Sequence, residues 1–360
     1  MKKSILSIFT FIFITTCAAQ YVGLNNNEVK QLNKLIQKND AVKKLFGDFT
    51  RDAESALNDT PNPRDTIVSE GHLATHPDKI ASQICMKDFN KIYALAIVHK
   101  VTNDKKYFDK AIVFLKAWAT VNHPLGNPIN DTKLDNLFEA YDMLRSQVSD
   151  ADKAIIDSWL ITMADNEIKT AKKGKTTSMN NWHSHRLKVI GQIGYILDNK
   201  TFRDFATNGL LMQIDTNLNK DGASWDFLER DALHYHAYDL EPMLALAIII
   251  KRATGSDEFT YVSPKGASIK KSVDWFLPYL NGEKTHGEYV NSKVAFDRER
   301  AKNNEKGFSI GANFEPSNGL LTLLLASWFD NKYASTARLI MKTESDFGDW
   351  QLVLNKVMKQ

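Results

Sequence analysis

The stretch Asp221–Met243, DGASWDFLERDALHYHAYDLEPM, joins a turn, a dense group of polar and aromatic side chains and the start of an apolar helix. The apolar run Leu244–Ile250 follows directly, which predicts a long and deeply buried helix over Asp231–Ala253. Polar and ionisable side chains are costly to bury. Their concentration at the start of a buried helix therefore indicates a functional site.

A second polar stretch, Asn180–Arg186 (NNWHSHR), opens the helix that is predicted over Asn180–Leu197. Four of the nine histidines of the chain lie in these two stretches. On a helix Asn181 and His185 are four residues apart and share one face. The alternative is that Asn180 or Asn181 only caps the helix and that the histidines are surface residues. We expect the two stretches to meet across one cleft.

The rest of the chain predicts an all-α fold of antiparallel helical hairpins. Between Arg64 and Lys79 the sequence is polar and irregular, as in a long surface loop, and only Gly287–Val294 hints at a strand. The sequence contains no clear repeat, so a solenoid is not expected. Hairpins of this number can stack linearly or curl into a toroid, and a toroid buries more surface for one domain of this length. Residues 20–360 are therefore predicted to form one toroidal domain. The other helices are expected over Asn25–Phe49, Cys85–Val101, Tyr107–Thr120, Leu134–Leu144, Asp150–Thr170, Phe202–Leu218, Ile269–Leu280, Gly319–Phe329 and Tyr333–Met341.

Residues 1–19 have the pattern of a secretory signal peptide. A charged start, Met1–Lys3, precedes the apolar stretch Ile5–Thr15 and small residues for cleavage before Gln20. Lipidation of Cys17 is the alternative to simple cleavage. Both predict a periplasmic or secreted protein, in which no internal disulfide forms because Cys85 is the only other thiol.

Charge and hydrophobicity limit the possible partners. The formal net charge is +3, and no block of lysines and arginines of the nucleic-acid-binding kind is present. Beyond the leader, no apolar run is long enough to cross a bilayer. An acidic substrate is compatible with this balance, whereas nucleic acid and membrane-spanning roles are not expected.

A metal site is the main alternative for the histidines. His183 and His185 form one His-X-His pair, and His234 and His236 form another, so four imidazoles could bind zinc. Helical residues two apart diverge by roughly 200°, however, and both stretches look helical. We therefore predict neither a metal nor another cofactor.

These residue types suit proton removal beside the carboxylate of a uronic acid. The carboxylate must first be neutralised by an amide, an imidazole or a guanidinium. A base then takes the carbon-bound proton and an acid protonates the departing glycosidic oxygen. A tyrosine next to an arginine can have a lowered pKa, and in a syn elimination one phenol can perform both steps. Asn181, His185, Arg230 and Tyr235 supply this set.

The Leu-His-Tyr-His run after an acidic and arginine-containing segment, together with the upstream Asn-Asn run, resembles the alginate lyase superfamily. The resemblance implies polysaccharide lyases on an incomplete (α/α) toroid. It implies that an asparagine and a histidine bind the uronate carboxylate, that an arginine assists, and that tyrosine is base and acid. These roles fall on Asn181, Arg230 and Tyr235, and on either His183 or His185 because Trp182 interrupts the family's Asn-Asn-His order. We prefer His185, which shares a helical face with Asn181.

Other side chains of the two stretches, and one arginine further on, are candidates for substrate binding, because aromatic faces stack on sugars and cations pair with uronates. These candidates are Asn180, Trp182, His183, His234, His236, Tyr238 and Arg298. The sequence thus predicts a lyase that cleaves a polyuronide by β-elimination. Mannuronate-rich alginate is preferred over glucuronan or another polyuronide.

Two other classes of protein remain open at this point. A glycoside hydrolase needs two carboxylates across the cleft, and Asp226, Glu229 and Asp231 are available without a clear second acid. A noncatalytic glycan-binding protein would bind the same polymer without forming a product.

Overall fold

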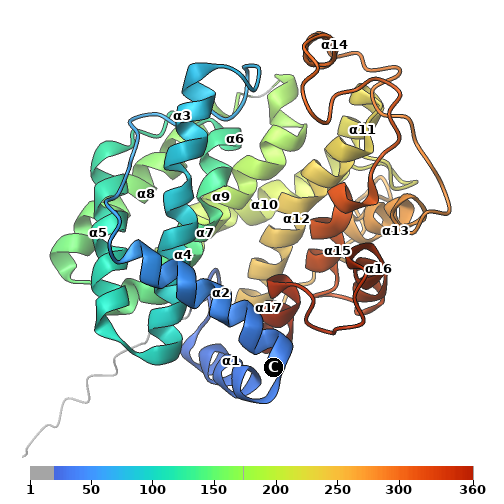
Figure 1. Cartoon of the computed structure of the whole chain (residues 1–360). Helices are drawn as coiled ribbons and strands as arrows, with labels where there is room; N and C mark the ends of the chain where they lie inside the picture. The colour runs from blue at the N-terminus through green and yellow to red at the C-terminus, as the bar shows by residue number, and fades with distance from the viewer. Residues whose placement is uncertain (1–19, 173, 360) are drawn as a thin grey trace, which may run out of the picture.

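The computed structural model describes residues 20–172 and 174–359, and its regular structure is helical (Figure 1). Within these ranges the extended pairings are two isolated bridges, Leu218 with Ser224 and Gly287 with Asn313. The predicted all-α class is confirmed, and the hint of a strand at Gly287–Val294 is reduced to one bridge. The predicted leader, with Cys17, lies outside the described residues. No helix in the described part combines the length and apolarity that a bilayer span needs.

The first half of the chain folds into helices that precede the NNWHSHR motif. They are α1 (Asn26–Lys38), α2 (Asp40–Ala56), α3 (Pro77–Cys85), α4 (Lys87–Thr102), α5 (Lys105–Val121), α6 (Pro128–Asp131), η1 (Thr132–Leu134), α7 (Asp135–Leu144), η2 (Arg145–Gln147), α8 (Asp150–Thr170) and η3 (Thr176–Ser178).

The second half contains both polar motifs. Its helices are α9 (Asn181–Ile196), α10 (Lys200–Asn217), α11 (Trp225–Arg230), α12 (Leu233–Thr254), α13 (Ile269–Leu280), α14 (Ala295–Lys302), η4 (Pro316–Gly319), α15 (Leu320–Ala326), α16 (Lys332–Met341) and α17 (Trp350–Met358).

A two-residue turn shows how the hairpins form. Asn103 ends α4 in the left-handed conformation, with φ of 59°. Asp104 then caps α5 by accepting a hydrogen bond from the main-chain N–H of Lys106. So short a turn makes α4 and α5 neighbours that run in opposite directions, as the sequence predicts.

The helix predicted over Asn25–Phe49 is wrong in one respect, because the structure breaks it at Asn39. This residue is extended, with φ of −135° and ψ of 116°, and its side chain caps α2 by accepting from Val42 N. The apolar positions keep nearly the same spacing on both sides of the break, so hydrophobic periodicity did not reveal it. The short helices α14 and α17 were likewise not predicted.

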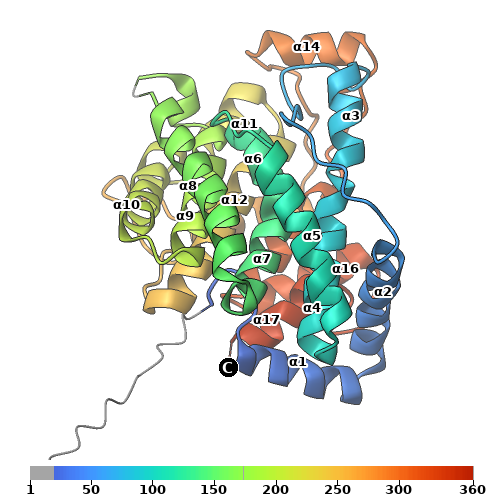
Figure 2. The same cartoon turned by 90° about the vertical axis from the view of Figure 1, so that its left-hand side faces the viewer.

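Helices α9 and α12 pack against each other in the middle of the molecule, and the other helical pairs surround them (Figures 1 and 2). Nearly all of α9 is buried, including polar residues of its first turns. The apolar end of α12, Leu244–Ile250, is buried or nearly so, as predicted. One hydrophobic core contains residues from Val22 to Val357. The two motif helices therefore form the centre on which the fold is built.

Close packing between α9 and α10 gives a test of this arrangement. A Cβ atom at Gly194 would lie 2.8 Å from the main-chain nitrogen of Arg203 and 3.0 Å from Cβ of Phe202. We expect Gly194→Ala to reduce the free energy of unfolding by about 1–3 kcal/mol, because α10 has to move away. Chemical denaturation followed by circular dichroism measures this change.

Gly47→Ala is the matched control, since Gly47 lies inside α2 with no neighbouring atom within 4 Å of the added carbon. Replacing a helical glycine without a clash should stabilise the protein by roughly 0.5–1 kcal/mol. Equal effects of the two substitutions would contradict the close α9–α10 contact.

Candidate active site

The first turn of α9 holds the polar residues of the NNWHSHR motif. Asn180 is the N-cap, and its side-chain oxygen accepts a hydrogen bond of 3.1 Å from Trp182 N. Asn181 is the first helical residue and is only 3% exposed. The capping role considered for this motif therefore belongs to Asn180, while Asn181 points into the protein.

A buried carboxylate holds Asn181 in place. Asp226 accepts a 2.8 Å hydrogen bond from Asn181 N and a second one from Asn181 Nδ2. It also accepts from Asn217 Nδ2 at 2.9 Å. Burial raises the pKa of Asp226, whereas the hydrogen bonds from Asn217 and Asn181 oppose that shift. Because Asn181 Nδ2 faces the carboxylate with one hydrogen, the orientation of the amide is fixed and its second N–H remains for a ligand.

His185 lies one turn further along α9 and is 4% exposed. Its Nδ1 is 2.9 Å from Thr132 Oγ1, whereas its Nε2 is buried and has no partner among the described residues. Burial, followed by the charges of Lys188 and Lys133, lowers the pKa of His185 well below its usual value. A neutral imidazole that accepts from Thr132 at Nδ1 carries its proton on Nε2. When the Thr132 hydroxyl donates to Nδ1, Nε2 of His185 is therefore a hydrogen-bond donor.

The structure distinguishes the two histidines of this motif. The ring of His185 lies 4.3 Å from the ring of Tyr238 on α12, measured between centroids. His183 is half-buried, and burial followed by the charge of Arg186 lowers its pKa to about 4. Of the two, His185 contacts the helix that carries Tyr235, which supports the preference for His185.

The start of α12 is set by a turn and a buried glutamate. Asp231 adopts the left-handed conformation, with φ of 48°, and separates α11 from α12. No side chain caps α12 from its own N-cap residue, Ala232. Instead, the Glu288 carboxylate accepts hydrogen bonds from Leu233 N (2.8 Å) and His234 N (3.1 Å). An anion at a helix N-terminus is favourable, so Glu288 fixes the first turn of α12.

Tyr235 lies between two arginines. The Arg230 guanidinium carbon is 3.8 Å from the centre of the Tyr235 ring, and Arg300 Nη1 donates a 3.0 Å hydrogen bond to the Tyr235 hydroxyl. Arg230 is held in turn by Asp297, at 2.6 Å. Burial raises the pKa of Tyr235, and the charges of Arg230 and Arg300 act against this shift. The side chain retains 8% exposure. Both cations stabilise a phenolate more than a phenol.

Arg300 was not among the predicted residues, whereas Arg298 was. Arg298 is exposed and donates to the main-chain oxygen of Ser292 at 2.8 Å. Arg300 is 8% exposed, and its guanidinium lies 4.2 Å and 4.3 Å from the rings of Phe296 and Phe308. The two arginines lie on different faces of α14 because they are two residues apart. The flanking phenylalanines are the sequence signal that could have favoured Arg300.

A contact between distant segments lies near Tyr235. Glu305 follows α14 and accepts a hydrogen bond from Ala74 N at 3.3 Å. Its carboxylate is also 3.8 Å from Lys79 Nζ and 3.7 Å from Arg300 Nε. The polar loop before α3 and the segment around α14 thus meet, as Figure 2 shows, and Arg300 lies at this contact. The predicted loop between Arg64 and Lys79 is part of the surroundings of the site, and Pro77 ends it by starting α3.

The profile of the alginate lyase family matches residues 37–286. The chain belongs to the alginate lyase family. It is therefore a polysaccharide lyase, as the sequence predicts. A search of curated proteins found no match.

Solved alginate lyases share the fold of this chain. The alginate lyase from Bacteroides ovatus is 15% identical with a TM-score of 0.66, and the match covers 94% of this chain and 99% of that one. Alginate lyase A1-III from Sphingomonas species A1 is 19% identical with a TM-score of 0.55, over 84% and 95% of the two chains. The predicted incomplete (α/α) toroid is confirmed by these matches.

The remaining candidates for substrate binding occupy different environments. His234 and Tyr238 are half-buried, with parallel rings 6.4 Å apart, and His234 also meets Tyr235 edge-on. Trp182 is half-buried at the start of α9. His236 needs a correction, because it has no exposed surface and bonds to Ser224 Oγ and Ser272 O. It joins α12 to neighbouring elements and does not face a sugar.

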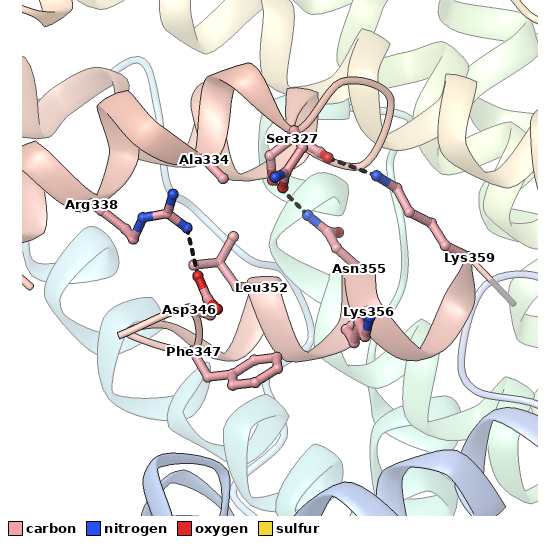
Figure 3. Close-up of a pocket in the computed structure, with 10 residues that line it drawn as sticks. Ser327, Ala334, Arg338, Asp346, Phe347, Leu352, Asn355, Lys356 and Lys359 are labelled. Atoms are coloured by element: carbon pink, nitrogen blue, oxygen red, sulfur yellow. Dashed lines mark hydrogen bonds and ion pairs between the residues drawn. The ribbon is translucent and has the colours of Figure 1, made fainter. Parts of the chain in front are cut away.

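A cavity of about 340 Å³ elsewhere in the molecule contains none of the motif residues (Figure 3). It lies between α16 and α17, where Arg338 pairs with Asp346 at 3.0 Å and Asn355 donates to Ser327 Oγ at 2.9 Å. In the described ranges, no group of three histidine, cysteine or acidic side chains has an arrangement that could hold a metal ion.

The burial of His236 predicts a pH-dependent stability. Burial lowers its pKa to about 4, below the unfolded value of about 6.5, so between these pH values the unfolded chain binds the extra proton. Its contribution to the free energy of unfolding is complete above pH 6.5 and is lost as the pH falls towards 4. Denaturant titrations of wild type and His236→Gln over this range should show a flatter curve for the variant, by up to about 1.4 kcal/mol per pH unit. Parallel curves would contradict a neutral, buried His236.

Proposed function

We propose that this alginate lyase family member cleaves a polyuronide by β-elimination, with Tyr235 as base and acid. Mannuronate-rich alginate is the proposed substrate, ahead of glucuronan or another polyuronide. The observation that carries the proposal is the Tyr235 hydroxyl in contact with Arg300, with Arg230 on its ring and the His185 donor on the adjoining helix. The leader pattern supports a periplasmic or secreted location, with or without a lipid on Cys17.

Neutralisation of the uronate carboxylate is assigned to α9. Asn181 is held by Asp226 with one amide hydrogen free, and His185 is held by Thr132 with Nε2 unpartnered. Both groups are neutral donors fixed before a substrate arrives, so little reorganisation is needed as negative charge develops. Binding of the carboxylate by these two donors acidifies the adjacent carbon-bound proton.

The elimination itself is assigned to Tyr235. The phenolate oxygen takes the proton from the carbon next to the carboxylate. The electron pair of that C–H bond forms the C=C bond while the bond to the glycosidic oxygen breaks. The same phenol then returns its proton to the leaving oxygen, so no water is consumed. Arg300 and Arg230 stabilise the phenolate, which burial alone would disfavour.

Relatives with the same fold support a role for these residue types. One solved relative is a tyrosine-to-phenylalanine variant of alginate lyase A1-III complexed with a tetrasaccharide, and another is a histidine-to-alanine variant complexed with a tetrasaccharide. A hydrolase would instead need two carboxylates at the sugar. Asp226, one of the acids considered for that role, is buried and bound to amides.

Tyr235→Phe removes the proposed base and acid while keeping the ring. We expect turnover to fall at least about 100-fold, the lower range for general acid–base catalysis, with oligosaccharide binding retained. The ultraviolet absorbance of the unsaturated product measures turnover on a panel of polyuronides, and calorimetry measures binding.

Tyr279→Phe is the matched control, because Tyr279 is a half-buried tyrosine on α13 that contacts Trp275 rather than the site. It should retain the activity of the wild type. A fully active Tyr235→Phe variant would assign the base to another residue. Absence of unsaturated product from the wild type on every polyuronide would remove the lyase proposal.

Arg300→Gln tests the cation at the phenol. Arg300 opposes the rise that burial causes in the pKa of Tyr235, so its removal should raise that pKa further. For a base that acts as phenolate, kcat/KM increases with pH, and the variant should need a higher pH to reach the same fraction of its maximum. The pH profile of kcat/KM measures this displacement. A lower rate with an unshifted profile would make Arg300 a structural residue.

A further inference from the structure

Lys133 lies beside the proposed site and has no role in the mechanism above. It belongs to η1 and directly follows Thr132, whose hydroxyl contacts His185. Its side chain is exposed, and Nζ is 5.7 Å from the centre of the Tyr238 ring. The same Tyr238 ring packs on His185. Lys133 therefore places an ammonium group on the side of Tyr238 and His185.

Charged groups from several helices act on Lys133. Although the residue is exposed, protein atoms around its ammonium group partly exclude water, and this desolvation, followed by the charge of Lys188 on α9, lowers the pKa of Lys133. Asp135 on α7 and Glu241 on α12 act in the opposite direction. Lys79 on α3 also lowers it. Lys133 is thus within electrostatic range of charged side chains on α3, α7, α9 and α12.

Neighbouring cations have carboxylate partners, and Lys133 does not. Lys188 pairs with Asp135, and Lys79 lies 3.8 Å from Glu305. Arg230 pairs with Asp297 at 2.6 Å. No hydrogen bond or ion pair joins Lys133 to any residue in the described ranges. Its positive charge is thus available to an anionic ligand.

We propose that Lys133 binds the carboxylate of a second uronate, on the sugar next to the one that reacts. This inference rests on the proposed function, since a polyuronide carries one carboxylate on each sugar. The ring of Tyr238 is 6.5 Å from that of Tyr235 and lies on the Lys133 side. Asn181 and His185 already supply two donors for the reacting sugar. A lysine acts as a point charge on a flexible stem, so it suits a carboxylate that need not be held rigidly.

The test compares Lys133→Met with Lys133→Arg. Loss of one charged contact should weaken binding of a mannuronate tetrasaccharide about 10- to 100-fold, measured by calorimetry in the Tyr235→Phe background. In the active enzyme Lys133→Met should raise KM by a similar factor and change kcat by less than about threefold. Lys133→Arg keeps the charge and should restore binding, and the loss in Lys133→Met should shrink at high salt.

Lys44→Met is the matched control, because Lys44 is an exposed lysine of α2 in the same chain. It should leave Kd, KM and the melting temperature unchanged. Equal Kd and KM for wild type and Lys133→Met would overturn the proposal, as would a large fall in kcat at unchanged KM.

Failure of the lyase proposal has a different signature. If no polyuronide yields unsaturated product but tetrasaccharide binding still depends on Lys133, the proposed carboxylate-binding role of Lys133 is supported and the proposed β-elimination is not. If the protein binds no oligouronide at all, the Lys133 proposal is overturned. If the wild type is active and Lys133→Met changes neither Kd nor KM, the lyase proposal stands and the Lys133 proposal is overturned.

Discussion

The buried carboxylate of Asp226 is the interaction on which the site depends. It joins the start of α9, the end of α10 and the first turn of α11 through the amides of Asn181 and Asn217. A buried carboxylate that lost these donors would be left with an uncompensated charge, which is strongly destabilising. The same hydrogen bonds determine which way the Asn181 amide faces. Fold stability and the orientation of the Asn181 amide, a donor proposed for the substrate carboxylate, therefore rest on one group.

Two opposing effects meet at Tyr235. Desolvation favours the neutral phenol, while Arg230 and Arg300 favour the anion. Neither arginine comes from the same helix as the tyrosine, since Arg230 ends α11 and Arg300 lies on α14. The balance at the hydroxyl is thus set by how α11, α12 and α14 are packed. Asp297 fixes Arg230, and Phe296 and Phe308 enclose Arg300.

The sequence was sufficient to predict the parts of the fold that follow from local patterns. The apolar stretch of α12 and the α4–α5 turn depend on near neighbours in the chain and were predicted. Asn180 was one of two residues considered as a cap of α9. The break at Asn39 was not, because a single extended residue leaves the helical spacing of apolar residues nearly intact. The juxtaposition of α9 and α12 was predicted from the cost of burying so many polar groups.

Partners that lie far apart in the sequence could not be predicted from local patterns. Arg300 is 65 residues from Tyr235, and Thr132 is 53 residues from His185. Glu288 reaches the start of α12 from 54 and 55 residues away. His236 shows the opposite error, in which a residue close in sequence was wrongly assigned to the site. It lies within the polar motif of the sequence, but its position on α12 directs its side chain into the core. Neighbours in sequence share a site only when they share a face.

Helix α12 carries residues of the proposed site near its start and residues of the hydrophobic core further along. The proposed chemistry lies in the first two turns, from Leu233 to Tyr238, while Leu244–Ile250 is packed in the interior. Within the early turns, His234 and Tyr238 are half-buried, whereas His236 holds α12 to its neighbours in the same way as the later apolar turns do. Related chains could therefore differ in the polymer that they accept through these two accessible positions, without loss of the packing that keeps the helix in place.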